Sequence, residues 1–191
     1  MAAGLASRPS RFAADYDGLI ALMTAVAEAD GDGIDVGPDD VRLECGDDEP
    51  GWVRAHWVWE AADGRLAAVS VVWHEVADAQ DRAYGAVDIH PDHRTTELED
   101  EVARTFREST AALAGKPVAA RVGAKRSQAW KTGMLERGGF RPDRSYVRMR
   151  RSLAEPTLAV DAGNESGALR HYESVGFAPY TTTVVYLVEI A

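Results

Sequence analysis

Residues 87–102, with the sequence VDIHPDHRTTELEDEV, change from a strand pattern to a helix pattern within a few positions. The strand-like run ends at Pro91, which has no backbone N–H to give to a sheet. After Arg94 the apolar residues recur at helical spacing as far as Leu113. A strand that turns directly into a helix indicates a domain containing both kinds of element.

The segments on either side of this stretch extend the same alternation of strands and helices. Asp63-Gly64 is a hairpin turn signal between two of the expected strands. In chain order we expect a helix at 14–29, a short helix between the acidic loops at 37–40 and 46–50, strands at 52–60, 65–76 and 84–90, a helix at 96–113, a strand at 117–122, a helix at 128–137 and a strand at 146–153. This order predicts a mixed α/β domain with its sheet between helices.

The C-terminal part of the chain carries a weak internal repeat. The tetrapeptide at 139–142, GFRP, returns as GFAP at 176–179. A short apolar strand and a helix precede each copy, and another strand follows it. The pattern predicts that a strand–helix–strand unit is written twice, although chance is the alternative for any single match.

The second copy contains LAVDAGNESGALRHYESVGF at 158–177. It resembles a segment of the GNAT acetyltransferase superfamily, in which an Asn opens a helix and a Tyr near the helix end precedes Gly-Phe. The resemblance implies that Asn164 helps to bind the pantetheine and phosphate region of acetyl-CoA. It also implies that Tyr172 is the general acid that returns a proton to the CoA thiolate.

The chemistry of these two residues allows both a functional and a structural interpretation. An Asn at a helix start caps unpaired N–H groups, and a helix N-terminus favours a nearby anion. A phenol has a pKa of about 10, so it keeps its proton until a thiolate departs. The alternatives are that Asn164 is only an N-cap and that Tyr172 is only a half-buried aromatic residue packed on the sheet.

Residues 87–102 resemble the main acetyl-CoA motif of the same family, through Val87, Ile89, Pro91 and Arg94. The resemblance implies that the strand backbone near Ile89 bonds the pantetheine, and that Arg94 introduces the turn that holds the pyrophosphate. Three other residues replace the glycines that the family has in this turn: Thr95, Glu97 and Glu99.

These replacements predict a weakened phosphate site. Glycine allows positive φ and close approach of the backbone to phosphate, which the replacements do not. Glu97, Glu99 and Asp100 also place negative charge where a polyanion would bind. The sequence from Thr96 to Glu99 matches a capping box, so we expect a self-capped helix start instead of an open phosphate loop.

Taken over the whole chain, the resemblance predicts a GNAT-like central mixed sheet flanked by helices, with an extra C-terminal β–α–β unit. Residues 8–152 would form one degenerate GNAT-like domain, and residues 156–191 a partial second unit. This arrangement is similar to that of the tandem GNAT proteins, the group that includes mycothiol synthase. We expect the strands at 157–160 and 183–188 to pair with the first sheet or with another chain, as in a homodimer.

A general base is needed if an amine is the acceptor. Asp88 and Glu75 lie on expected strands and could each take this role, with Asp88 as the residue we assign; the alternative is that either is a solvent-facing strand residue. No metal is expected, because the histidines lack the close spacing of metal ligands: His56, His74, His90, His93 and His171.

The composition excludes some classes of partner. The net charge of −10 argues against nucleic acid, whose phosphates are neutralised by Lys and Arg. No apolar run approaches the roughly 20 residues of a membrane span. Cys45 is the single cysteine, so no internal disulfide forms, which fits a reducing cytoplasm. We expect a cytoplasmic protein without a membrane partner.

The resemblance favours transfer of an acetyl group from acetyl-CoA to a small-molecule amine. The replaced glycines favour a weak or inactive chain. The alternative hypothesis is a non-catalytic GNAT-like domain that acts as a scaffold or binds a small molecule.

Overall fold

The computed structural model describes residues 4–31, 36–46, 50–77, 81–150, 158–163 and 167–191. The chain forms two compact units. Unit 1 comprises Met1–Val122 with Val188–Ala191, and unit 2 comprises Gly123–Leu187.

Unit 1 contains the elements formed by residues 87–102 and by the segments on either side of them. In chain order they are β1 (Leu5–Pro9), α1 (Phe12–Ala29), α2 (Pro38–Cys45), β2 (Trp52–Ala61), β3 (Leu66–Glu75), β4 (Arg82–Ile89), the 3-10 helix η1 (Pro91–His93), α3 (Thr96–Ala114) and most of β5 (Val118–Lys125). Each helix and strand expected here from the sequence is present, with ends that move by a few residues. The short strand β1 was not expected.

The strands of unit 1 follow one another in the order β1-β2-β3-β4-β5. The first four are joined as antiparallel neighbours, and β5 pairs parallel to β4. A parallel neighbour needs a crossover connection, which α3 supplies between β4 and β5. The expected mixed sheet flanked by helices is therefore confirmed.

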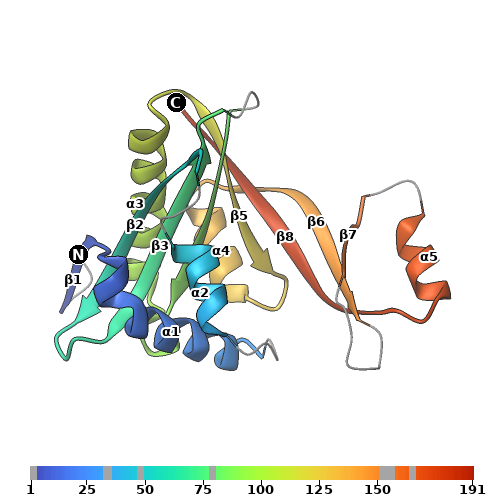
Figure 1. Cartoon of the computed structure of the whole chain (residues 1–191), viewed down its shortest axis with the longest axis horizontal. Coiled ribbons are helices and arrows are strands. Elements are labelled where there is room, and N and C mark those ends of the chain that lie inside the picture. The colour runs from blue at the N-terminus through green and yellow to red at the C-terminus, as the bar shows by residue number, and fades with distance from the viewer. Residues whose placement is uncertain (1–3, 32–35, 47–49, 78–80, 151–157, 164–166) are drawn as a thin grey trace. The chain divides into compact units, whose positions relative to one another are not determined.

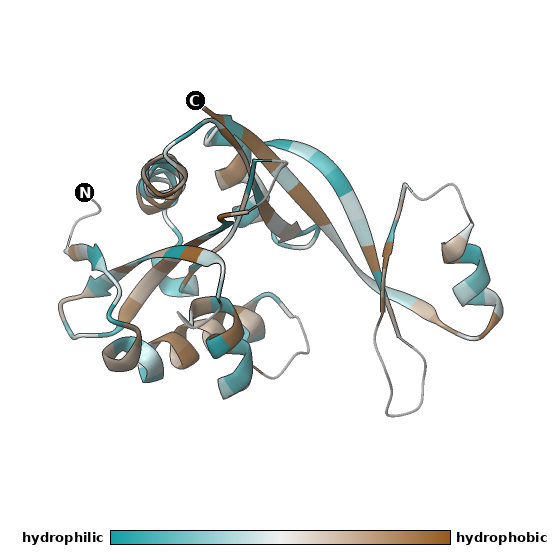
Figure 2. Ribbon diagram, turned by 45° about the horizontal axis from the view of Figure 1, so that its top comes forward, coloured by the Kyte–Doolittle hydropathy of each residue, from teal (hydrophilic) through white to brown (hydrophobic). Residues whose placement is uncertain are grey.

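Helices cover both faces of these strands, with α1 and α2 on one side and α3 on the other (Figure 2). The apolar stripe of α1 packs against alternate residues of β2 and β3, including Val58 and Val69. The next residue along β2, Trp59, points to the opposite face and donates a hydrogen bond to Glu101 of α3. Side-chain alternation along β2 thus supplies both layers of the core.

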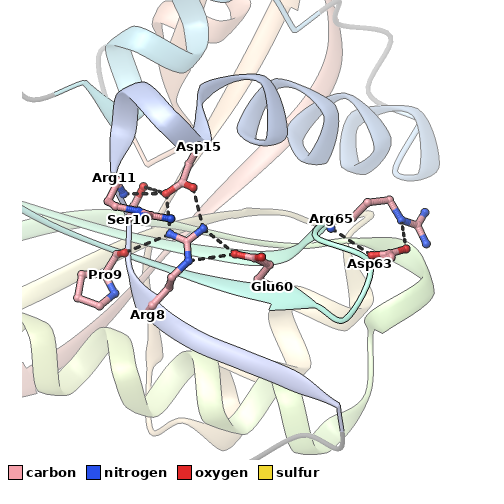
Figure 3. Close-up of polar contacts among 8 residues, drawn as sticks. All are labelled: Arg8, Pro9, Ser10, Arg11, Asp15, Glu60, Asp63 and Arg65. Carbon is pink, nitrogen blue, oxygen red and sulfur yellow. Dashed lines mark hydrogen bonds and ion pairs between the residues drawn. The ribbon is translucent and has the colours of Figure 1, made fainter.

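An ionic cluster ties the start of α1 to the edge of the sheet (Figure 3). Arg8 of β1 makes two hydrogen bonds to the carboxylate of Asp15, at 2.7 and 2.8 Å, and two more to Glu60 of β2. Ser10 and the backbone N–H of Arg11 also donate to Asp15. The carboxylate is almost completely buried, so the cluster fixes the position of β1 relative to α1.

Unit 2 is built around a long antiparallel pair (Figure 1). Its elements are the end of β5, α4 (Ala129–Arg137), β6 (Arg141–Arg150), β7 (Leu158–Asp161), α5 (Ala168–Ser174) and most of β8 (Ala178–Ile190). Strand β6 pairs antiparallel with β8 on one side and with β7 on the other. The strands expected at 157–160 and 183–188 therefore both pair with the strand of the first sequence copy.

The two compact units meet after Val122. This division does not test the domains predicted from the sequence, 8–152 and 156–191, which stay a prediction. Strand β6, from the first sequence copy, lies in the same unit as β7, α5 and most of β8. A tandem origin for the repeat is not tested by this division and stays a prediction, as does a homodimer.

Candidate functional site

The carboxyl end of β4 carries two of the predicted site residues. Asp88 and Ile89 pair with Val69 and Ala68 of β3 on one side of the strand. Ile89 has a fully buried side chain, whereas Asp88 is half-buried. On the other side, the parallel ladder with β5 runs only from Arg82 to Gly85. The last four residues of β4, 86–89, therefore extend beyond the ladder with β5. Their backbone edge on the β5 side is not part of that ladder.

A tight turn connects this strand end to α3. The backbone N–H of His90 still bonds to β3, through the carbonyl of Ala67 at 2.8 Å. The chain then makes one turn of 3-10 helix, in which the backbone N–H of His93 donates to the carbonyl of His90. Pro91 occupies the first position of this turn, where its missing N–H costs nothing. His90 and His93 therefore lie at the start and the end of this turn.

Arg94 is held by two bonds in this turn. Its Nε donates to the carbonyl of Ile89 at 3.2 Å, and its Nη1 lies 2.8 Å from a carboxylate oxygen of Asp30. Only 16% of the Arg94 side chain and 5% of the Asp30 side chain are exposed. Arg94 therefore joins the end of β4, the start of α3 and the end of α1, and its charge is compensated by a buried carboxylate.

The N-terminus of α3 is capped, as the sequence predicted, but by a different residue. The hydroxyl of Thr95 accepts a hydrogen bond from the backbone N–H of Leu98 at 3.3 Å. The predicted capping box from Thr96 to Glu99 is wrong, because Thr96 is already the first helical residue. With Thr95 as the cap, the third helical position is Leu98, which has no side-chain acceptor for a reciprocal bond.

The acidic residues of the first turn do not all face water. Glu99 is 7% exposed, whereas Glu97 and Asp100 are exposed. The two exposed carboxylates place negative charge close to the first N–H groups of α3. That charge is favourable for the helix dipole and unfavourable for a bound phosphate.

The other two predicted site residues belong to the second sequence copy. Asn164 lies outside the described residues. Tyr172 lies in the short helix α5 of unit 2, half-buried, and its ring contacts those of His171 and Phe177 edge-on at centroid distances of 5.7 and 5.8 Å. The backbone N–H of Phe177 donates to the carbonyl of Tyr172, so the Gly-Phe turn closes against the end of α5.

The structure thus brings together Asp88, Ile89 and Arg94 in unit 1, whereas Tyr172 belongs to unit 2. The partner of Arg94 was missed from the sequence. Asp30 lies 64 positions earlier, beside a Gly that marks only the end of a helix. No local pattern in the sequence connects these two residues.

None of the helices in the described part of the chain is long and apolar enough to cross a membrane. Among the same residues, no group of three or more His, Cys, Asp or Glu side chains is arranged to hold a metal ion.

Comparison with solved structures gives full-length matches to GNAT acetyltransferases. A GCN5-related N-acetyltransferase from Sphaerobacter thermophilus matches with a TM-score of 0.79 at 15% identity, covering 99% of this chain and 96% of that one. Spermidine N-acetyltransferase from Vibrio cholerae, in complex with CoA and spermine, matches with a TM-score of 0.61 at 12% identity, covering 97% and 95%. The ribosomal-protein-S18-alanine N-acetyltransferase from Escherichia coli matches with 0.60 at 11%, covering 98% and 94%.

These matches show that the chain has the fold of the GNAT acetyltransferases. At such low identity they show the fold alone. No family model matches the sequence, and no curated protein matches it.

Proposed function

We propose that the chain is an N-acyltransferase that transfers the acetyl group of acetyl-CoA to a small-molecule amine. The observation that carries the proposal is the end of β4, where the backbone runs beyond its ladder with β5 and turns directly into the N-terminus of α3. An extended thioester substrate can bond to such a backbone edge, and its phosphates can approach the helix N-terminus.

In the proposed reaction, the amine nitrogen attacks the carbonyl carbon of the thioester and the bond from that carbon to sulfur breaks. Asp88 takes the proton that the amine loses. Tyr172 gives its hydroxyl proton to the departing thiolate. A positioned acid or base of this kind contributes typically about 100-fold to 10,000-fold to a rate.

The binding roles follow the same proposal. The backbone at Ile89 bonds the pantetheine, and Asn164 assists at the phosphate end. The role of Arg94 is mainly to position this backbone, because its guanidinium already joins Ile89 to Asp30. We place the reaction in the cytoplasm, to which a single, buried cysteine is suited.

Thiol release from acetyl-CoA, followed with a panel of primary amines, tests the proposal. We expect saturable turnover with at least one amine. The Tyr172→Phe and Asp88→Asn variants should each lower kcat by about 100-fold or more, with little change in the dissociation constant of acetyl-CoA. If both variants retain full turnover, the assignment of Tyr172 as the acid and Asp88 as the base would be wrong.

The second candidate is a non-catalytic GNAT-like scaffold or small-molecule binder, such as a remnant of a tandem enzyme. The capped, acidic start of α3 favours it, because Thr95 already occupies one of the N–H groups that would face a phosphate. In that case, thiol release would stay at the rate of the protein-free control with every amine.

A further inference from the structure

The carbonyl of Ile89 lies on the edge of β4 that the proposed function uses for acetyl-CoA. The backbone N–H of His90 bonds to β3, and successive residues of a strand direct their backbone groups to opposite sides. The N–H and the carbonyl of Ile89 therefore point away from β3. They point to the side where residues 86–89 extend beyond the ladder with β5.

Arg94 holds this carbonyl from the β5 side of the strand. Its Nε donates to the oxygen of Ile89 at 3.2 Å, so a bond within the chain already engages that oxygen. The N–H of Ile89 points to the same side, and it is the donor that a carbonyl group of an extended substrate would meet. Displacement of the Arg94 side chain would therefore change both the position of this edge and the groups that it presents.

Asp30 fixes the side chain of Arg94. A long arginine side chain loses conformational entropy when it is held in one rotamer, so a second contact is needed to keep it in place. Nη1 of Arg94 lies 2.8 Å from a carboxylate oxygen of Asp30, and the two side chains are only 16% and 5% exposed. A hydrogen bond between charged groups is about twice as strong as one between neutral groups. The pair thus supplies the second contact.

The end of α1 does not itself require a carboxylate at this position. Asp30 follows the last residue of the helix, where the helix dipole disfavours a negative charge. The last turn of α1, which lies wholly within the described residues, contains no basic residue to compensate it. Gly31, in the left-handed conformation with φ at 66°, already ends the helix. The contact with Arg94 accounts for an acidic residue here.

The end of α1 is also a rigid support. The backbone N–H of Asp30 bonds to the carbonyl of Val26 at 3.0 Å. Val26 is buried in the core that α1 forms with β2 and β3. A continuous series of contacts therefore runs from this packed helix, through Asp30 and Arg94, to the carbonyl of Ile89.

We propose that Asp30 is a positioning residue for acetyl-CoA, which holds Arg94 on the carbonyl of Ile89 and so keeps the edge of β4 in its binding conformation. Because acetyl-CoA is the substrate that this edge would bind, the role of Asp30 rests on the proposed function. Asp30 acts through Arg94 and has no part in the transfer of the acetyl group itself.

Calorimetric titration of the full chain with acetyl-CoA compares the native protein with Asp30→Asn, which keeps the size of the side chain and removes its charge. We expect the dissociation constant to rise by about fivefold to tenfold, which corresponds to the loss of one hydrogen bond at the edge. The value of kcat at saturating acetyl-CoA should change by less than about twofold, because the variant alters binding alone. A general loss of structure would lower kcat as well.

Asp15→Asn is the matched control. Asp15 lies in the first turn of the same helix, its side chain is also 5% exposed, and it is paired with Arg8 at 2.7 Å. The variant therefore disrupts an equally buried ion pair and should also lower stability. This pair lies at β1, three strands away from β4 in the sheet order, so the affinity for acetyl-CoA should equal that of the native chain.

A double-mutant cycle tests whether Asp30 acts through Arg94. Methionine has a similar length and cannot donate to Ile89, so Arg94→Met should weaken binding at least as much as Asp30→Asn. In the Arg94→Met background, Asp30→Asn should change the dissociation constant by less than about twofold, because both changes remove the same contact. If Arg94→Met does not fold, the comparison of Asp30→Asn with Asp15→Asn decides.

Native affinity in Asp30→Asn would overturn the positioning role, as would equal losses in Asp30→Asn and Asp15→Asn or additive effects in the cycle. Tighter binding in Asp30→Asn would also overturn it, and would mean that Asp30 competes with the phosphates for Arg94. A native chain that does not bind acetyl-CoA would overturn both the transferase and the role of Asp30. If the native chain binds and only the variants fail to respond, the proposed transferase stands without this role.

Discussion

At the scale of single residues, the candidate site shows which features were readable from the sequence. The strand that ends near Pro91 and the acidic helix start were predicted from local patterns, and both are present. The choice of Thr95 over Thr96 as the cap was not predictable, because both threonines can cap and only the backbone conformation decides. Similarly, the ion pair from Arg94 to Asp30 depends on the packing of α1 beside the turn.

Removal of Arg94 should destabilise the protein through the carboxylate that it leaves behind. Asp30 is almost completely buried, so Arg94→Ala should lower the free energy of unfolding by about 3–5 kcal/mol. Chemical denaturation measures this change. The control is Arg65→Ala, which breaks an exposed pair with Asp63 and should cost less than about 1 kcal/mol. Equal losses in the two variants would refute a structural role for the buried pair.

Asp15 should make a measurable contribution to acid stability. Hydrogen bonds from Arg8, opposed in part by burial, hold the pKa of Asp15 down to about 2 from its ordinary value of 3.8. Because its pKa is lowered in the folded chain, the ionised carboxylate of Asp15 stabilises the fold. This stabilisation is fully present above about pH 4 and is lost as the pH falls through about 2. The shift corresponds to roughly 2 kcal/mol.

Thermal unfolding of the native chain and of Asp15→Asn between pH 2 and pH 6 checks this contribution. The native chain should be more stable near pH 6, and the difference between the two should shrink as the pH falls towards 2. A difference that stays constant over this range would show that the charge of Asp15 contributes nothing.

At the scale of elements, the long amphipathic helices and the alternating strands were predictable because their patterns are local. Strand β1 was missed, since its five residues show no clear alternation and are ordered by pairing with β2. The strand order was also beyond local patterns. It depends on pairings between segments far apart in the sequence, such as β6 with β8.

One glycine in β4 is required by the packing of α3. A Cβ atom on Gly85 would overlap with the ring of Phe106 and the carbonyl oxygen of Val71. Gly85→Ala should therefore lower the free energy of unfolding by about 1–3 kcal/mol, as overpacking does. Chemical denaturation again supplies the measurement.

The matched control is the same substitution in helix α4. A Cβ on Gly133 would lie 3.4 Å from the end of the flexible Arg137 side chain. Gly133→Ala should stabilise the helix by up to about 1 kcal/mol, because alanine has the higher helix propensity. Loss of stability in both variants alike would argue against a specific contact at Gly85.

At the scale of the whole molecule, the fold and the chemistry have different support. The fold agrees with GNAT acetyltransferases over nearly the full length of both chains. Motifs predicted Ile89, Arg94, Asn164 and Tyr172, and Asp88 was predicted from its place on a strand. Within unit 1, the structure groups Asp88, Ile89 and Arg94 at one strand end. Sequence resemblance could locate the candidate residues, but it could not show that Arg94 is engaged by a buried carboxylate.

Calorimetric titration of the full chain with acetyl-CoA tests the central claim most directly, because no transfer can occur without this binding. The proposed transferase predicts saturable, one-to-one binding of acetyl-CoA. No heat of binding at millimolar acetyl-CoA would contradict the proposal and would favour a GNAT-like fold that no longer uses the substrate.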